Sequence, residues 1–234
     1  MYCSRSQTKN GNVIKNISLY NLFYLLKLVD SGYLIKHASS YDILLCEDDL
    51  CFHTLPYTSG NYLTIYEIFE IKTYDIEVSG VVIDIGAEIG DSSIYFAING
   101  ASKVIGLEVN PILAKIAIKN IETNGLNDKV IILPYAIGSI DSETTFGSTK
   151  VKQITFNTLV SIYNIKNIDL VKIDCEGCEY DIIPTLPFQI INKIIMEYHD
   201  YPQFIPTILT QAGFIVKYDK NKRIGILRAY KEKT

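Results

Sequence analysis

The sequence has no excess of positive charge, no long apolar run and no repetitive tract. Its 22 Lys and Arg residues against 26 Asp and Glu give a net charge of −4, so no overall field attracts polyanions, and nucleic-acid binding would need a local basic patch. No internal repeat, low-complexity tract or proline-rich linker is visible. With 48% hydrophobic residues in 234 positions, a disordered chain is excluded and one domain with a large core is expected.

No segment is long and apolar enough to predict a membrane span. The run "LYNLFYLLKLV" at 19–29 contains Asn21 and Lys27 and is well short of the roughly 20 residues that a span needs, so a buried amphipathic helix is expected. The polar start "MYCSRSQTKN" does not have the pattern of a secretory signal. These features predict no membrane span and a cytoplasmic location.

The five cysteines are an odd number in a chain long enough to fold without cross-links. This favours free thiols in a reduced, intracellular compartment. Cys175 and Cys178 form a C-x-x-C motif, which could be half of a zinc site or a redox pair. Because no second C-x-x-C or paired His motif accompanies it, we expect both side chains to fill small buried positions where a strand turns into a helix.

From residue 81 onward, apolar strand-like runs alternate with helical patterns. Strands are expected at 81–85, 103–108, 129–134, 168–174 and 193–199, and helices at 91–99, 111–124, 155–163, 177–183 and 203–212. Such alternation implies parallel strands with helical crossovers. A turn-rich segment is expected at 138–153, and the closing strands 214–218 and 223–230 predict an antiparallel hairpin at the sheet edge. The predicted fold is α/β, with a doubly wound, mostly parallel, Rossmann-like sheet.

Polar residues gather where the predicted strands end. In an open parallel sheet, ligands bind beyond the carboxyl ends of the strands. Seven unusual polar residues lie at or just after such ends: Asp84, Glu108, Tyr135, Asp174, Glu176, Glu197 and His199. Helix caps or loop contacts explain one or two of them, but the full set predicts a ligand site.

The stretch "VVIDIGAEIGD" at 81–91 distinguishes between two cofactors. A dinucleotide would place its pyrophosphate on a G-x-G-x-x-G loop, but this loop reads G-A-E-I-G and carries Asp84, Glu88 and Asp91, which would repel that anion. S-adenosylmethionine has no phosphate and carries sulfonium and ammonium cations, so the loop favours it. Glu108, at the end of the next strand, is placed to bind both ribose hydroxyls.

The chain resembles the FkbM-type S-adenosylmethionine-dependent methyltransferases over roughly residues 60–218. The stretches that carry the resemblance are "VVIDIGAEIGDSSIYFA", "KVIGLEVNP", "IKNIETNGL", "YAIGS", "VKIDCEGCEYDII" and "IIMEYH". The most specific of them is the K-x-D-x-E-G-x-E pattern at 172–179. The family usually has Asn where this chain has Glu88, a change that adds negative charge near the cofactor.

The resemblance implies a methyltransferase-type sheet and methyl transfer to a hydroxyl, on a sugar, lipid, polyketide or other small molecule. It implies a cofactor-binding domain at 79–234 after an N-terminal extension at 1–78, which we expect to line or cover the acceptor pocket. The predicted cofactor-binding residues are Asp84, Gly86, Ala87, Glu88, Gly90, Asp91, Glu108, Val109, Asn110, Tyr135, Ala136 and Asp174. Of these, Tyr135 and Ala136 would lie near the adenine.

The predicted catalytic rim consists of Asp174, Glu176, Glu197 and His199. In this reaction the protein supplies positioning and removes the acceptor proton. Our hypothesis makes His199 the base, with Asp174 as its rival. No metal is predicted, because no spacing demands one, although these carboxylates and the one His could hold magnesium.

Other functions remain open at this stage. An enzyme that methylates base amino groups would be expected to have an N-P-P-Y-like turn where this chain has "DCEG", but an RNA ribose acceptor is still compatible. The basic C-terminal residues, which a solvated edge hairpin explains more simply, are Lys217, Lys220, Lys222, Arg223, Arg228, Lys231 and Lys233. A non-catalytic module with the same fold is disfavoured by the retained acidic rim, and a nicotinamide dehydrogenase by the first loop. Nothing in the sequence specifies the acceptor or the oligomeric state.

Overall fold

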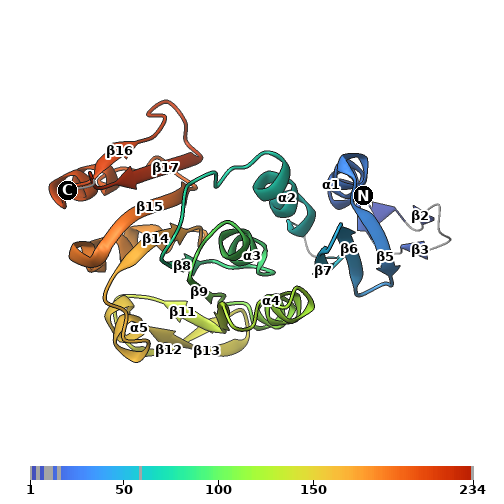
Figure 1. Cartoon of the computed structure of the whole chain (residues 1–234), viewed down its shortest axis with the longest axis horizontal. Coiled ribbons are helices and arrows are strands. Elements are labelled where there is room, and N and C mark those ends of the chain that lie inside the picture. The colour runs from blue at the N-terminus through green and yellow to red at the C-terminus, as the bar shows by residue number, and fades with distance from the viewer. Residues whose placement is uncertain (1, 4–5, 8–12, 15–16, 58–59, 233–234) are drawn as a thin grey trace.

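The computed structural model describes residues 2–3, 6–7, 13–14, 17–57 and 60–232, and its centre is a seven-stranded sheet (Figure 1). The strand order is β10-β9-β8-β14-β15-β17-β16. The strands are β8 (Val81–Ile85), β9 (Lys103–Leu107), β10 (Val130–Leu133), β14 (Ile168–Ile173), β15 (Ile191–Tyr198), β16 (Ile215–Lys217) and β17 (Gly225–Tyr230). Only β17 runs antiparallel to its neighbours within this sheet. The predicted doubly wound sheet with a closing hairpin is confirmed.

Both faces of the sheet are buried, which explains why its strands read as near-continuous apolar runs. Alternate strand residues belong to two separate cores. One core holds Val82, Val104 and Leu170 together with helices α3 (Asp91–Ile98) and α4 (Pro111–Thr123). The opposite core is formed with helices α5 (Phe156–Ile162), α6 (Glu179–Ile182) and α7 (Ile205–Gln211). With both faces covered, a ligand is expected beyond the carboxyl ends of the strands.

Local capping explains where two of these helices begin. Asn110 precedes α4, and its side chain accepts a hydrogen bond of 3.0 Å from the backbone N–H of Ile112, with Pro111 at the first helical position. Thr155 precedes α5 and accepts one of 3.1 Å from Thr158 N–H. Such residues satisfy backbone donors that the first helical turn leaves free.

The N-terminal part forms a smaller layer beside α4. It contains α1 (Leu19–Ser31), an antiparallel sheet of β5 (Leu34–Ala38), β6 (Ile43–Glu47) and β7 (Leu50–Thr54), and α2 (Asn61–Ile65), which continues as the π-helix η1 (Tyr66–Glu70). Short strand pairs join β1 (Tyr2–Cys3) to β4 (Ile17–Ser18) and β2 (Ser6–Gln7) to β3 (Val13–Ile14).

Side-chain amides attach this layer to the main sheet. Asn120 on α4 accepts a hydrogen bond of 2.6 Å from His53 N–H, and Asn124 accepts one of 2.9 Å from Cys51 N–H; both amides donate back to the carbonyls of the same residues. These pairs provide hydrogen-bond partners for the backbone N–H and C=O groups of Cys51 and His53 on the outer edge of β7. The β5–β7 sheet is therefore held against α4 by specific hydrogen bonds as well as by apolar packing.

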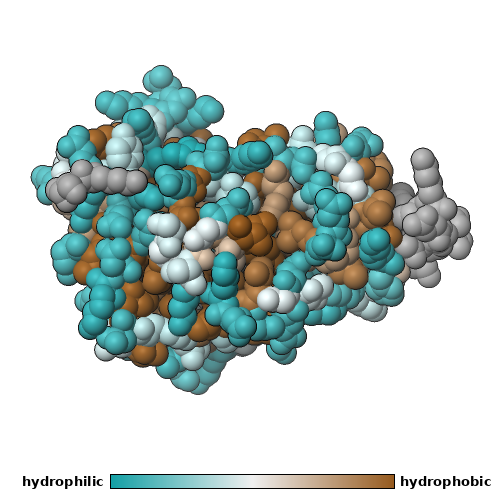
Figure 2. All heavy atoms as spheres, viewed as in Figure 1, coloured by the Kyte–Doolittle hydropathy of each residue, from teal (hydrophilic) through white to brown (hydrophobic). Residues whose placement is uncertain are grey.

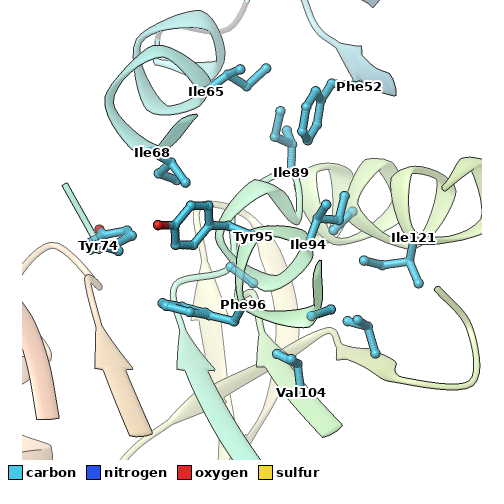
Figure 3. Close-up of a cluster of buried hydrophobic side chains, with 14 of the residues drawn as sticks. Phe52, Ile65, Ile68, Tyr74, Ile89, Ile94, Tyr95, Phe96, Val104 and Ile121 are labelled. Carbon is cyan, nitrogen blue, oxygen red and sulfur yellow. The ribbon is translucent and has the colours of Figure 1, made fainter. Parts of the chain in front are cut away.

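Aromatic rings join η1 and the segment that follows it to α3, and Figure 3 shows Tyr74, Tyr95 and Phe96 of this cluster. The rings of Phe69 and Tyr95 meet edge to face at 5.6 Å, and those of Tyr74 and Phe96 lie 6.1 Å apart. Such ring pairs add to the stability that burial alone provides. The cluster fixes the segment 66–74 above the carboxyl ends of the central strands.

Two expectations about individual elements are wrong. The segment 138–153, expected as turns, contains the strands β12 (Ser142–Phe146) and β13 (Thr149–Ile154), which join β11 (Tyr135–Ile137) in a three-stranded sheet. Its β-branched residues flank one tight turn at Gly147, where φ is 59°, and this pattern favours a hairpin.

Helix α1, expected to be buried, is covered on one side only. Leu19, Phe23 and Leu26 are each slightly more than half exposed, because α2, η1 and the rest of the N-terminal layer pack against the opposite side of the helix. Apolar surface also emerges between polar residues on the face shown in Figure 2. Among the helices that the structure describes, none combines the length and the hydropathy required to cross a membrane.

Candidate active site

A cavity of about 580 Å³ opens at the carboxyl ends of the central strands, within the usual range of roughly 300–1,000 Å³ for ligand sites. Most of the predicted site residues line it: Gly86, Glu88, Glu108, Val109, Asn110, Tyr135, Ala136, Asp174, Glu176, Glu197 and His199. An adjoining space of about 40 Å³ is lined by Asp91 and also by Gly86, Glu88, Asp174 and Glu197. Asp84, Ala87 and Gly90 line neither space.

Asp84 lies wholly beneath the first loop. Its Oδ2 accepts hydrogen bonds from the hydroxyls of Ser92 (2.7 Å) and Ser93 (2.6 Å), and its Oδ1 is 3.2 Å from Lys172 Nζ. All of this carboxylate is buried. An effect of Asp84 on a ligand would therefore pass through the loop that it supports.

Lys172 joins β14 to that loop. Its Nζ donates to the carbonyl of Gly86 at 2.6 Å and faces the ring of Tyr74 at 5.6 Å. Burial works against the charged form, but Asp84, Asp174 and Asp91 outweigh it and raise the pKa of Lys172 to about 12. The ammonium group is therefore charged, and it holds the first loop in place.

Gly86 permits the loop to approach β14 closely. Its φ is +78°, and a Cβ atom at this position would lie 1.7 Å from the carbonyl oxygen of Asp174. No residue with a side chain could occupy this position without displacing the end of β14. The close packing brings the first loop and the end of β14 together at the cavity, which Gly86 and Asp174 both line.

Glu108 follows β9 and lines the cavity. It is 6% exposed, and its two oxygens accept hydrogen bonds from Asn110 N–H (2.7 Å) and Glu88 N–H (2.9 Å). Burial raises the pKa of this carboxyl, and the two backbone donors oppose the shift. Each oxygen of an ionised carboxylate has a second lone pair. Both oxygens can therefore still accept a hydrogen bond from a ligand hydroxyl in the cavity.

Glu88 is the acidic residue of the first loop that departs from the Asn usual at this position. Its Oε1 accepts a hydrogen bond of 2.6 Å from Asn61 Nδ2, which links the first loop to α2. Burial, followed by the nearby Asp91, raises the pKa of Glu88 to about 8. Near neutral pH this carboxyl is therefore mostly protonated, and the added negative charge expected from the sequence is largely removed.

The predicted catalytic rim comes together around His199. Its Nε2 lies 3.8 Å from Asp174 Oδ1 and 3.5 Å from Glu176 Oε1. Tyr74 donates a hydrogen bond of 3.2 Å to the other oxygen of Asp174. Burial and then Asp174 raise the pKa of Glu197 to about 7. The rim can therefore accept a proton at neutral pH from a group bound in the cavity.

The same rim could also hold a cation. Ligand atoms of Asp174, Glu197 and His199 all lie within 4.8 Å of one another, the one such His, Cys, Asp or Glu group found in the part of the chain that the structure describes. Carboxylate oxygens and an imidazole nitrogen suit a divalent cation such as Mn²⁺. The absence of a metal stays a prediction.

Several lining residues were missed by sequence reasoning. They come from α2 and η1 and from the β12–β13 hairpin: Gly60, Leu63, Thr64, Glu67, Thr144, Thr145, Phe146 and Gln153. No local pattern marks them, because only the tertiary packing brings them over the strand ends. The extension thus reaches the cavity through residues 60–74, whereas residues 17–57 line neither space.

The expectation of free cysteines is wrong for four of the five. Cys46 is disulfide-bonded to Cys51, and Cys175 to Cys178. The first bond crosses the β6–β7 hairpin, where the two residues are directly paired. The second closes a ring at the mouth of the cavity, which both of its cysteines line. The fold brings each pair together over a short sequence separation, a proximity that counting cysteines could not reveal.

Comparisons with known proteins agree with this geometry. A family model described as "Methyltransferase FkbM domain" matches residues 84–221. Among curated proteins, the ribosomal protein L11 methyltransferase of Carboxydothermus hydrogenoformans is 29% identical over 79 residues, which cover 34% of this chain. The match spans only 26% of that relative's length.

Solved structures show the same fold. The methyltransferase FkbM from Methylobacillus flagellatus KT superposes with a TM-score of 0.55 at 13% identity, over 70% of this chain and 48% of that one. A putative transferase from Pyrococcus horikoshii gives a TM-score of 0.52 at 17% identity, over 84% of this chain and 74% of that one. Since the family model matches more than half of the 234 residues, the chain belongs to the FkbM methyltransferase domain family, whose cofactor is S-adenosylmethionine.

Proposed function

We propose that this protein transfers a methyl group from S-adenosylmethionine to a hydroxyl of an uncharged small molecule, sugar or lipid. The observation that carries the proposal is the lining of the 580 Å³ cavity: the described residues that line it are acidic, apolar or neutral polar, together with His199, and none of them is Lys or Arg. A phosphate-bearing acceptor would be repelled by such a lining, whereas hydroxyl groups find acceptors at Asp174, Glu176, Glu197 and His199.

In this proposal the cofactor lies along the first loop. Gly86 brings the backbone close, Glu108 accepts from the ribose hydroxyls, and Tyr135 and Ala136 lie beside the adenine. When bound, S-adenosylmethionine supplies an electrophilic methyl group on a cationic sulfur. The carboxylates of Asp91 and Asp174 near the loop suit that cation.

His199 is the proposed base, with Asp174 as the alternative. Its Nε2 faces the cavity rim and its Nδ1 lies 3.5 Å from the buried carboxylate of Glu179, so the ring is oriented on the side away from the acceptor. Neighbouring carboxylates stabilise the imidazolium that forms when the hydroxyl proton moves to Nε2. The other contribution of the protein is to hold the hydroxyl in line with the methyl group.

An RNA acceptor is less well supported. Several of the basic C-terminal side chains are engaged within the protein: Arg228 donates to the Thr73 carbonyl at 2.7 Å, Lys231 to the Phe188 carbonyl at 2.5 Å, and Arg223 pairs with Asp200 at 3.1 Å. They lie on an edge hairpin and do not line the cavity. This arrangement favours a solvated edge over a phosphate-binding surface.

The test is release of S-adenosylhomocysteine with panels of hydroxylated metabolites, glycans, lipids, RNA and ribosomal protein. Turnover with an uncharged hydroxyl compound supports the proposal, and turnover only with RNA or protein overturns it. With an accepted substrate, His199→Ala should lower kcat by about 10²- to 10⁴-fold and preserve cofactor affinity. The matched control is His37→Ala, an exposed histidine on β5, which should leave both unchanged.

A further inference from the structure

We propose that Cys175 and Cys178 are a redox-active pair, and that their disulfide holds the 175–178 turn in the conformation that orients the catalytic rim. Reduction by a cellular dithiol would release the turn and lower turnover with little effect on cofactor binding. The effect on turnover rests on the proposed function, but the redox chemistry and the release of the turn do not. The inference uses a motif for which the proposed methyl transfer has no need.

The disulfide encloses an unusual stretch of backbone. Between the two cysteines, Glu176 has a φ of 56° and Gly177 a φ of 117°. A non-glycine residue with positive φ is uncommon and persists when the surrounding structure enforces it. The bond between Cys175 and Cys178 closes a four-residue ring around these two positions, so it is the covalent element that keeps the turn closed.

The ring is connected directly to His199. Glu176, inside the ring, places its carboxylate 3.5 Å from Nε2. Cys175 N–H donates a hydrogen bond of 3.4 Å to Oε1 of Glu179, and this oxygen also lies 3.5 Å from Nδ1 of His199. Both nitrogens of the imidazole are therefore positioned by carboxylates that the ring holds in place. Opening the ring would loosen both contacts together.

A purely stabilising role does not fit the position of this bond. A disulfide stabilises a fold mainly by constraining the unfolded chain, and the effect grows with the length of the loop that it closes. Cys175 and Cys178 are three positions apart, which gives one of the smallest possible effects of this kind. The main consequence of the bond is thus local, at the edge of the cavity.

The pair is also accessible to exchange. Both cysteines are partly exposed and line the large cavity, so a thiolate can approach from solvent. In the reaction, a dithiol attacks one sulfur, the S–S bond breaks through a mixed disulfide, and the dithiol becomes a disulfide. The protein gains two electrons and two protons as Cys175 and Cys178 become thiols. Oxidation by a disulfide such as oxidised glutathione reverses the step.

The experiment compares the air-oxidised and dithiothreitol-reduced protein. The chain has three histidines, so the imidazole resonances of His37, His53 and His199 can be separated by NMR. Reduction should shift the His199 resonance, and should accelerate hydrogen exchange of the amides of Cys175, Asp181 and Ile182 about tenfold or more. Cofactor affinity, measured by calorimetry with S-adenosylhomocysteine, should stay within a few-fold.

Two double variants assign these effects to one bond. Cys175→Ser with Cys178→Ser should reproduce the reduced spectrum of His199 and no longer respond to dithiothreitol. Cys46→Ser with Cys51→Ser removes the disulfide on β6 and β7, beside His53, and should leave the response of His199 intact. If either pair of substitutions prevents folding, the wild-type comparison with mass-resolved thiol alkylation still identifies which bond is reduced.

The proposal is overturned if Cys175 and Cys178 alkylate as free thiols in the oxidised protein. It is also overturned if reduction of their bond leaves the His199 resonance and the three amides unchanged. Neither readout requires an acceptor. A failure to methylate hydroxyl compounds would therefore remove the proposed function and leave these results standing.

Discussion

Glu179 Oε1 lies 3.5 Å from Nδ1 of His199, although Glu179 is only 1% exposed. A buried carboxylate facing one ring nitrogen favours the tautomer with the proton on that nitrogen and leaves Nε2 as the acceptor. The other oxygen of Glu179 has no hydrogen-bond partner among the residues that the structure describes. In the proposed reaction, Glu179 is thus a positioning residue for the base, and it does not itself line the cavity.

Replacing Glu179 tests this relationship. Glu179→Gln preserves size but removes the charge that stabilises the imidazolium, so kcat should fall by about 10- to 100-fold and the limb of the pH profile that reports His199 should move. The change is measured with an accepted hydroxyl substrate. Glu122→Gln, at an exposed position on α4, serves as the control. An unchanged pH profile with kcat within about twofold of wild type would assign Glu179 to structure alone.

A second prediction concerns the cofactor. Glu108→Ala removes the carboxylate that we expect to bind both ribose hydroxyls, so the binding free energy of S-adenosylmethionine should weaken by about 1.5–3 kcal/mol, the scale of charge-assisted hydrogen bonds. Calorimetry measures this directly. Glu143→Ala, at an exposed residue on β12 that pairs with Lys150 at 3.7 Å, should bind normally. Equal affinity of the Glu108 variant and wild type would remove Glu108 from the cofactor site.

The central sheet and the rim could be predicted because both depend on short-range patterns. Apolar runs such as 81–85 and 168–174 specify buried strands, and parallel strands bring their carboxyl ends to one edge. Asp174, Glu197 and His199 therefore meet although they are far apart in sequence. The residues 60–74 and the hairpin β12–β13 reach the cavity through tertiary packing, which no local pattern encodes.

A third prediction concerns the buried ion pair beneath the first loop. The side chains of Lys172 and Asp84 are 3% and 0% exposed, with a separation of 3.2 Å. Lys172→Met leaves the Asp84 carboxylate buried without its cation, so the free energy of unfolding should fall by about 3–5 kcal/mol. Urea denaturation measures the loss. Lys119→Met, which breaks a half-exposed pair with Asp42 at 2.9 Å, should cost about 1 kcal/mol or less. A comparable loss in both variants would show that the buried pair has no special role.

The last prediction follows from the raised pKa values of buried carboxyls. Burial raises the pKa of Glu88 from 4.5 to about 8, that of Glu197 from 4.5 to about 7 and that of Asp91 from 3.8 to about 6. Each group binds its proton more tightly in the folded state than in the unfolded state. At a pH between the ordinary and the raised pKa of such a group, the folded protein therefore binds more protons than the unfolded chain. Its free energy of unfolding should consequently fall as the pH rises from about 4 to about 8.

Glu88→Gln should make that fall smaller. Since one pKa unit corresponds to about 1.4 kcal/mol, the loss of unfolding free energy between about pH 5 and about pH 9 should be at least about 1.4 kcal/mol less in the variant than in wild type. Urea titrations at both pH values give the two differences, and comparing losses cancels any pH-independent effect of the substitution, such as an altered contact with Asn61. The exposed change Glu143→Gln should leave the wild-type loss unchanged. If Glu88→Gln shows the full wild-type loss, the Glu88 carboxyl ionises in the folded protein as it does in the unfolded chain, and the first loop carries its negative charge at neutral pH.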